Sequence, residues 1–364
     1  MIDFSLDGDT TLIVQAARRY AQAELAPQQR AFEAAGSICA PTWQAAAEMG
    51  LLRACWRDEH GGSGLGWGAW IDVLSEIAQG DAAAAVAIDS AGAGYDALWQ
   101  AGHEAWVREF LALEPGAHGA QHPVVVHDLQ GRLTHTDAGR IDGVMPWVST
   151  ARADLVVVVG ATGVHVVREG FTLEPVSALA LQGAGSSRLR FEQAPVAASQ
   201  PDASLAESIL ARSRLRQAAI LLGVLQAASV YAREYALQRV AFGKPIAHHQ
   251  ALAFLLVDMN SAAEQTRSLV QLAACRLDAG DDAIEACNQA FIQACDAGHF
   301  VGPNAVQILG AAGFMRDYPV EKFMRELTAL ALALGGADAT RDTLNRQVAL
   351  PASLDWLPAD AEVA

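Results

Sequence analysis

The 364-residue sequence is poor in aromatic, basic and cysteine residues. Aromatic side chains make up only 7% of a chain that is 52% hydrophobic, so alanine, leucine and valine supply most of the apolar surface. This composition favours long, closely packed helices over a β-barrel wrapped around a ligand. Lys and Arg number 25 against 41 Asp and Glu, which gives a net charge of −16. We expect no nucleic-acid partner, because phosphate backbones are bound by clustered cations.

The cysteines show no pattern of metal binding or disulfide pairing. No two of them form a Cys-x-x-Cys pair, and no histidine cluster lies near them at zinc-ligand spacing. We therefore expect reduced, buried thiols at Cys39, Cys55, Cys275, Cys287 and Cys295.

Secretion and membrane signals are also lacking. The first residues, MIDFSLDGDTTL, are acidic where a secretory signal is basic, and no uninterrupted apolar stretch follows them. The apolar run from Leu327 to Leu334 is far shorter than the roughly 20 residues that cross a bilayer. We expect a cytoplasmic protein with no membrane insertion.

Hydrophobic periodicity predicts a helical first domain over residues 1–117. Apolar residues recur at three-to-four spacing over 10–25, 42–52, 67–78 and 82–98. A glycine-rich stretch at 58–66 contains a G-x-G sequence. Because it follows helical sequence and not a buried strand, it is interpreted as a turn between helices and not as a dinucleotide-binding loop.

The remaining sequence predicts a β-domain and then a helical bundle. Over 118–200, short β-branched runs without helical crossovers favour an antiparallel barrel or sandwich, with a linker at 197–204. Over 201–364, long amphipathic helices joined by short turns indicate an antiparallel four-helix bundle, and the predicted helices span 205–239, 247–278, 282–309 and 317–334. The predicted fold is mainly α with a central β-domain.

Two motifs in the third domain carry a family resemblance. Residues 239–250, RVAFGKPIAHHQ, resemble the R-x-x-F-G-x-x-I-x-x-x-Q signature of acyl-CoA dehydrogenases. Residues 307–326, QILGAAGFMRDYPVEKFMRE, resemble the family's Q-x-x-G-G-x-G-x-x-x-x-Y-P-V-E-K-x-x-R-D block. Residues 59–62, Glu76 and residues 147–154 add further matches, so the likeness covers nearly the whole chain. The chain resembles a divergent acyl-CoA dehydrogenase, with a helical N-terminal domain, a small β-barrel and a C-terminal four-helix bundle.

The resemblance implies a bound FAD in a site shared between subunits. The indole of Trp147 and the hydroxyl of Ser149 correspond to groups that line the flavin ring. Arg239 corresponds to a residue that reaches the FAD diphosphate from the neighbouring subunit, for which a guanidinium is suited. Ala311 replaces a glycine of the family motif. The full set of implied FAD contacts is Trp147, Val148, Ser149, Arg239, Phe242, His249, Gln250, Gln307, Gly310, Ala311 and Gly335.

The implied substrate is an acyl-CoA thioester, with Arg214 placed near the thioester. The implied partners are an electron-transfer flavoprotein or a similar acceptor, and further subunits in a homotetramer or in a heterotetramer with a sister chain.

The sequence departs from the family at the catalytic base. Leu334 occupies the position of the usual glutamate, and Ser213 occupies the alternative position on the first bundle helix. Neither side chain is a carboxylate, although a general base contributes a factor of about 100 to 10,000. Asp338 and Glu326 are the nearest substitutes along the chain. A second departure is at 121–128, where QHPVVVHD replaces the family's T-E-P-x-x-G-S-D loop.

Three functions remain open from the sequence. The first is acyl-CoA dehydrogenation by a base-lacking subunit of a hetero-oligomer, in fatty acid or sterol side-chain degradation. The second is a homo-oligomeric flavin-dependent monooxygenase or oxidase, and the third is a non-catalytic subunit.

Overall fold

The computed structural model describes residues 7–111, 123–136 and 139–347. Six helices begin the chain: α1 (Gly8–Tyr20), α2 (Gln29–Ala35), α3 (Ala40–Glu48), α4 (Trp67–Gly80), α5 (Ala82–Gln100) and α6 (Glu104–Leu111). The β-domain contains β1 (Pro123–His127), β2 (Leu133–Thr136), β3 (Arg140–Val148), β4 (Leu155–Gly160), β5 (Gly163–Val167), β6 (Phe171–Pro175) and β7 (Ser187–Gln200). The last part contains α7 (Ala203–Gln238), β8 (Val240–Ala241), β9 (Lys244–Pro245), α8 (Gln250–Asp278), α9 (Ile284–Leu309), α10 (Val320–Leu332) and α11 (Gly336–Gln347). This order confirms the mainly α fold with a central β-domain.

The central helix α7 begins and ends at sites that the sequence encodes. Asp202 precedes it and accepts hydrogen bonds from the amides of Ser204 and Leu205 at 2.9 and 3.2 Å. An aspartate cap of this kind stabilises a helix by about 1 kcal/mol, because it pairs amides that have no partner inside the helix. The helix ends at Gln238, and Arg239 takes an extended conformation with φ −73° and ψ 119°. The β8–β9 hairpin then turns the chain back into α8.

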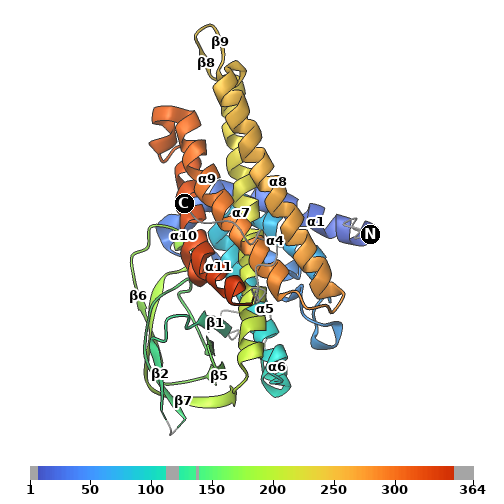
Figure 1. Ribbon diagram of the computed structural model, residues 1–364, viewed down its shortest axis with the longest axis vertical. Coiled ribbons are helices and arrows are strands. Elements are labelled where there is room, and N and C mark those ends of the chain that lie inside the picture. Colours follow the sequence, from blue (N-terminus) through green and yellow to red (C-terminus); the bar gives the residue numbers. More distant parts are fainter. Residues whose placement is uncertain (1–6, 112–122, 137–138, 348–364) are drawn as a thin grey trace, which may run out of the picture.

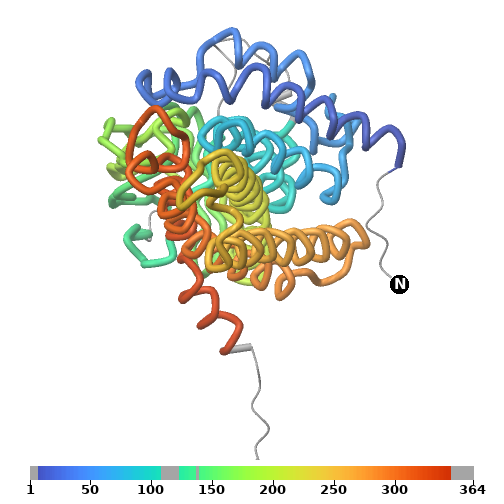
Figure 2. The backbone as a smooth tube through the Cα atoms, turned by 90° about the horizontal axis from the view of Figure 1, so that it is seen from above, coloured from blue at the N-terminus to red at the C-terminus, as the bar shows by residue number. Residues whose placement is uncertain are grey.

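The long helices α7, α8 and α9 run side by side, with the β8–β9 hairpin at one end of the molecule and the β-domain at the other (Figure 1). Seen from above, the first helices lie along one side of this bundle (Figure 2). Their buried side chains, such as Phe32 and Trp70, belong to the same hydrophobic core as Leu215 and Phe291 of the bundle. The two helical regions therefore stabilise each other through one shared core.

Glycine permits the closest approach within this core. A Cβ atom at Gly223 of α7 would lie 2.2 Å from the carbonyl oxygen of Ser75 in α4. The α4–α7 contact therefore depends on the missing side chain at this position.

By length and composition alone, α7 is also apolar enough to cross a membrane, but 72% of its apolar window is buried inside the protein. It is the core helix of the bundle, and it is longer than the apolar run that the sequence analysis considered.

The β-domain is a curled sheet with the strand order β1-β4-β5-β7-β3-β2, and β6 pairs with β7. The predicted antiparallel arrangement is found for every described pair except β1 with β4, which run parallel. β1 lies at one edge of the sheet, whereas β2, the next strand in the chain, lies at the other edge. The parallel pair brings the end of β1 next to α7, which matters for the site described below.

The predicted linker at 197–204 is wrong for most of its length. Strand β7 continues to Gln200, and α7 begins at Ala203. The first half of β7 pairs with β3 and its second half pairs with β5, so residues 196–200 are held by sheet hydrogen bonds. Proline and alanine in this stretch resemble a linker locally, but the neighbouring strand β5 supplies the partners of an ordered strand.

The expectation that all five cysteines are buried is wrong, and no disulfide joins the cysteines within the described residues. Cys287 and Cys295 lie in the core, whereas Cys39 is exposed because it precedes α3 in a surface turn.

Candidate functional site

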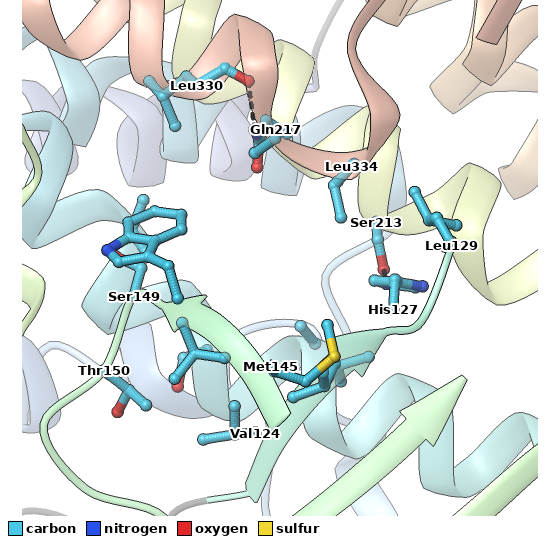
Figure 3. Close-up of a pocket in the computed structure, with 18 of the residues that line it drawn as sticks. Val124, His127, Leu129, Met145, Ser149, Thr150, Ser213, Gln217, Leu330 and Leu334 are labelled. Atoms are coloured by element: carbon cyan, nitrogen blue, oxygen red, sulfur yellow. Dashed lines mark hydrogen bonds between the residues drawn. The ribbon is translucent and has the colours of Figure 1, made fainter. Parts of the chain in front are cut away.

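A cavity of about 550 Å³ lies where the β-domain meets the helices (Figure 3). Helix α5, the end of β1, the end of β3, helix α7 and the turn between α10 and α11 all contribute to its wall. Six of the residues singled out from the sequence line this cavity: Trp147, Val148, Ser149, Ser213, Leu334 and Gly335. The fold thus brings the predicted flavin-contacting strand and both predicted base positions to one place.

The end of β3 presents a polar group that lacks a partner. Trp147 donates a hydrogen bond from Nε1 to Ser186 Oγ at 2.7 Å, which holds the indole in one orientation. Ser149 Oγ is buried and has no hydrogen-bond partner among the described residues. Leaving a buried hydroxyl unpaired costs about 1–3 kcal/mol, so this position indicates an external partner. A flavin ring, with its polar edge atoms and flat apolar faces, fits this combination of indole and hydroxyl.

The turn that carries Leu334 has an uncommon backbone. Leu334 has φ 51° and ψ 29°, in the left-handed region, and Gly335 and Gly336 follow with φ 89° and 62°. Arg214 holds this turn, since its Nε and Nη2 donate to the Leu334 carbonyl oxygen at 3.2 and 3.1 Å. The Leu334 side chain points toward the cavity (Figure 3).

Arg214 itself lies behind this turn and does not line the cavity. Its side chain is fully buried, and Nη1 donates to Asn288 Oδ1 at 2.9 Å. Among the described residues it forms no ion pair with a carboxylate, and burial lowers its pKa to about 10. A contact between Arg214 and the acyl thioester remains a prediction, whereas its structural role in holding the Leu334 turn is observed.

Ser213 has a partner that the sequence analysis did not identify. The His127 imidazole, at the end of β1, lies with Nε2 3.0 Å from Ser213 Oγ (Figure 3). His127 Nδ1 is inaccessible to solvent and has no partner among the described residues. Burial, with a smaller contribution from Arg214, lowers the pKa of His127 to about 3, so the ring is neutral at physiological pH. The signal was present in the sequence, because His127 replaces the serine of the family's G-S-D loop.

The carboxylates near the cavity are already engaged. Asp89 pairs with Arg216 and accepts a hydrogen bond from Trp70 Nε1 at 3.0 Å. Asp128 accepts from the amides of Arg132 and Leu133 at 2.8 and 2.9 Å. Both stabilise the walls of the site, and neither carboxylate is without a partner.

The two carboxylates that the sequence offered as substitute bases lie outside the cavity lining. Glu326 is buried against Lys322, with 2.5 Å between Oε1 and Nζ. Asp338 is exposed and pairs with Arg341 at 3.1 Å.

The second group of predicted FAD residues lies far from the cavity within one chain. Arg239, Phe242 and Gln250 are at or next to the β8–β9 hairpin, at the opposite end of the bundle from the β-domain (Figure 1). Phe242 is 96% exposed, has φ 51°, and packs its ring edge-to-face against His249 at 6.1 Å. A left-handed backbone and an exposed aromatic ring both cost free energy when only water surrounds the hairpin. This hairpin is therefore a candidate contact surface.

The loop after α9 approaches the same end of the bundle. Tyr318, which follows it, packs against Tyr235 in the last turn of α7, with 6.3 Å between ring centres. The predicted contacts in the last turn of α9 and in the short 3-10 turn that follows it are all exposed: Gln307, Gly310 and Ala311.

Comparison with known proteins identifies the family. Residues 203–349 match the family described as acyl-CoA dehydrogenase, C-terminal domain, and residues 8–113 match acyl-CoA dehydrogenase, N-terminal domain. The short-chain specific acyl-CoA dehydrogenase of Megasphaera elsdenii is 27% identical over 359 residues, which cover 89% of this chain and 94% of that protein. The benzylmalonyl-CoA dehydrogenase of Aromatoleum aromaticum is 27% identical over 382 residues, which cover 95% of this chain and all of that protein.

Solved structures show the same fold. Butyryl-CoA dehydrogenase from Megasphaera elsdenii superposes with a TM-score of 0.84, 24% identity and coverage of 95% of this chain and 99% of that chain. PigA, solved with FAD and proline, gives a TM-score of 0.83 at 17% identity, with 95% of this chain and 99% of that chain covered. The order of the two matched domains, the β-domain between them and the shared fold lead to one conclusion: the chain is a member of the acyl-CoA dehydrogenase family.

Proposed function

We propose that this protein is an FAD-dependent oxidoreductase of acyl-CoA thioesters whose flavin site is completed by a neighbouring subunit. The observation that carries the proposal is the unpartnered hydroxyl of Ser149, which lies beside the oriented indole of Trp147 in a cavity at the junction of two domains. Relatives over almost the full chain length are named as dehydrogenases of acyl-CoA thioesters, which supports this substrate class.

The residues of the cavity have distinct roles in this proposal. Trp147 would cover a face of a bound flavin, and the Ser149 hydroxyl would donate a hydrogen bond to its polar edge. Bound FAD supplies a two-electron acceptor for hydride. Apolar side chains such as Val124, Leu330 and Leu334 line the chamber and exclude water from the acyl chain.

The neighbouring subunit supplies the diphosphate contacts. Arg239 and Phe242 are exposed at the end of the bundle opposite to the cavity, so within one chain they cannot reach a flavin held by Ser149. A guanidinium in this position provides the charge and forked geometry that a diphosphate requires. The neighbour is a second copy of this chain or a sister chain, and electrons leave through an electron-transfer flavoprotein or a similar acceptor.

The test is to purify the chain alone and together with any homologue encoded beside it. The expected result is a yellow oligomer with FAD absorbance that is bleached under anaerobic conditions by members of an acyl-CoA panel. Substitution Ser149→Ala should weaken FAD retention, whereas Ser199→Ala, on the outer part of β7, should not. A colourless protein that takes up no FAD, alone or with the homologue, would refute the proposal.

A further inference from the structure

The position that would hold the alternative base is joined to an imidazole. Ser213 lies on α7 and His127 ends β1, and the two side chains meet at the cavity wall beneath Leu334 (Figure 3). Their polar atoms are 3.0 Å apart. In the tautomer with its proton on Nδ1, the Nε2 atom of His127 accepts the hydrogen bond that the Ser213 hydroxyl donates. This arrangement couples a hydroxyl at the cavity wall to a neutral nitrogen base behind it.

The charged groups around the pair do not compete for this role. Asp89 is neutralised by Arg216, and Asp128 is held by two backbone amides. Arg214, the cation next to His127, donates hydrogen bonds to the Leu334 carbonyl oxygen and to Asn288 Oδ1. His127 is the imidazole that lines the cavity within the part of the chain that the structure describes, and it is unprotonated, which leaves its Nε2 lone pair available for a proton.

We propose that Ser213 and His127 together accept the α-proton of the acyl thioester, an inference that rests on the proposed function. The pair takes the place of the glutamate that the family resemblance leads one to expect at Leu334 or Ser213. The chain then needs no carboxylate from a sister subunit to begin the reaction.

The proton and electron balance of this step is simple. The α C–H bond breaks, and its proton passes to Ser213 Oγ while the Ser213 hydroxyl proton passes to His127 Nε2. The electron pair of the α C–H bond forms the Cα–Cβ double bond as the β C–H bond breaks and its hydrogen leaves with both electrons as hydride, for which bound FAD would be the oxidant. When sulfur replaces the β-carbon, no hydride can leave and the proton transfer is reversible. In D₂O a deuteron then returns to the α-carbon.

This reversibility gives a readout that does not depend on redox turnover. The probes are thioether acyl-CoA thioesters of several chain lengths, in which sulfur replaces the β-carbon so that no hydride can leave. The purified holoprotein is incubated with each probe in D₂O, and deuterium at the α-carbon is followed by mass spectrometry. We expect exchange above the solvent background for at least one probe.

Variants separate a catalytic role from a structural one. His127→Gln retains a hydrogen-bonding partner for Ser213 but cannot accept a proton, and it should slow exchange by about 100-fold or more. Ser213→Ala removes the relay and should slow exchange by at least about 10-fold. His135→Gln is the matched control, because His135 is exposed on β2 and does not line the cavity; it should leave exchange unchanged.

FAD content and anaerobic bleaching are measured on the same samples, so that the two proposals fail separately. No exchange by the wild-type holoprotein, or exchange by His127→Gln at the wild-type rate, overturns the role of the pair. If such a protein still binds FAD and is bleached by an acyl-CoA, the proposed function stands without it. If no preparation binds FAD, the proposed function fails and the pair has no dehydrogenation to serve.

Discussion

Replacing Leu334 by glutamate tests the geometry of the cavity most directly. The Leu334 side chain already points toward the cavity, and its left-handed backbone, with φ 51°, imposes the same strain on leucine and glutamate. The Arg214 guanidinium is bonded to the carbonyl of this residue at 3.1 and 3.2 Å. This cation, bonded to the backbone of the same residue, favours the ionised form of the new carboxyl, since a nearby opposite charge lowers the pKa of a carboxyl group.

The expected gain follows from the chemistry of the added group. A positioned general base contributes a factor of about 100 to 10,000, and the imidazole of His127 is a weak base, with a pKa lowered to about 3. Leu334→Glu should therefore raise the α-proton exchange rate and the anaerobic bleaching rate by about 100-fold. The loss of partly buried apolar surface should lower stability by about 1 kcal/mol.

Leu334→Gln is the matched control, because it has the same shape without the charge. The assay compares deuterium exchange, bleaching rate and FAD content for wild type and both variants at neutral pH. If Leu334→Glu and Leu334→Gln behave alike while both retain FAD, then the Leu334 side chain does not reach the substrate α-carbon. That result would refute the placement of the reacting atoms in this cavity.

Four further predictions concern individual contacts. Ser149→Ala should stabilise the FAD-free protein by about 1 kcal/mol, since it removes an unpaired buried hydroxyl, while it weakens FAD binding measured by fluorescence titration; equal binding would contradict the flavin contact. Arg239→Ala, directly after α7, should weaken FAD binding by about 10- to 100-fold without changing the melting temperature, whereas the control Arg233→Ala, exposed on α7, should leave FAD binding unchanged; unchanged binding by Arg239→Ala would exclude a diphosphate contact. Lys322→Met should cost about 3–5 kcal/mol in denaturant unfolding, because it leaves Asp81 and Glu326 buried without their cation, whereas the exposed Lys244→Met should cost little. His127 has a folded-state pKa lowered from 6.5 to about 3, so its contribution to stability is present above pH 6.5 and is lost as the pH falls toward 3. The melting temperature of His127→Gln should therefore drop less than that of the wild type over this pH range. Parallel curves of melting temperature against pH for the two proteins would argue against a buried neutral imidazole.

The sequence predicted the longer helices well because their signals are local, but it did not predict the shorter helices α2, α6 and α11. Periodic apolar residues and the Asp202 cap specify α7 over 203–238, close to the expected 205–239. The linker at 197–204 was wrong because strand pairing of β7 with β5 depends on a neighbour that no local pattern reveals. The parallel pairing of β1 with β4 was missed for the same reason.

The residues of the candidate site were likewise predicted only in part. The family resemblance implied that Trp147 and Ser149 belong to the site, and the fold places both at the cavity. The motif containing Arg239 predicted a diphosphate contact, but the fold places Arg239 next to the β8–β9 hairpin, at the end of the bundle opposite to the cavity. A local sequence pattern carries no information on which surfaces meet between subunits. The contact of Arg239 with the diphosphate therefore stays a prediction.

The sequence by itself determined the family, the order of the domains and the absence of a carboxylate at Leu334 and Ser213, because these are properties of residue identity and spacing. Only the tertiary structure decided that His127 meets Ser213 across 86 residues and that Arg214 holds the Leu334 turn across 120 residues. Such contacts depend on how strands and helices pack, and packing is set by the whole core at once. The physical reason is that a hydrogen bond needs atoms about 3 Å apart, and a local sequence pattern carries no information on distances between separate elements.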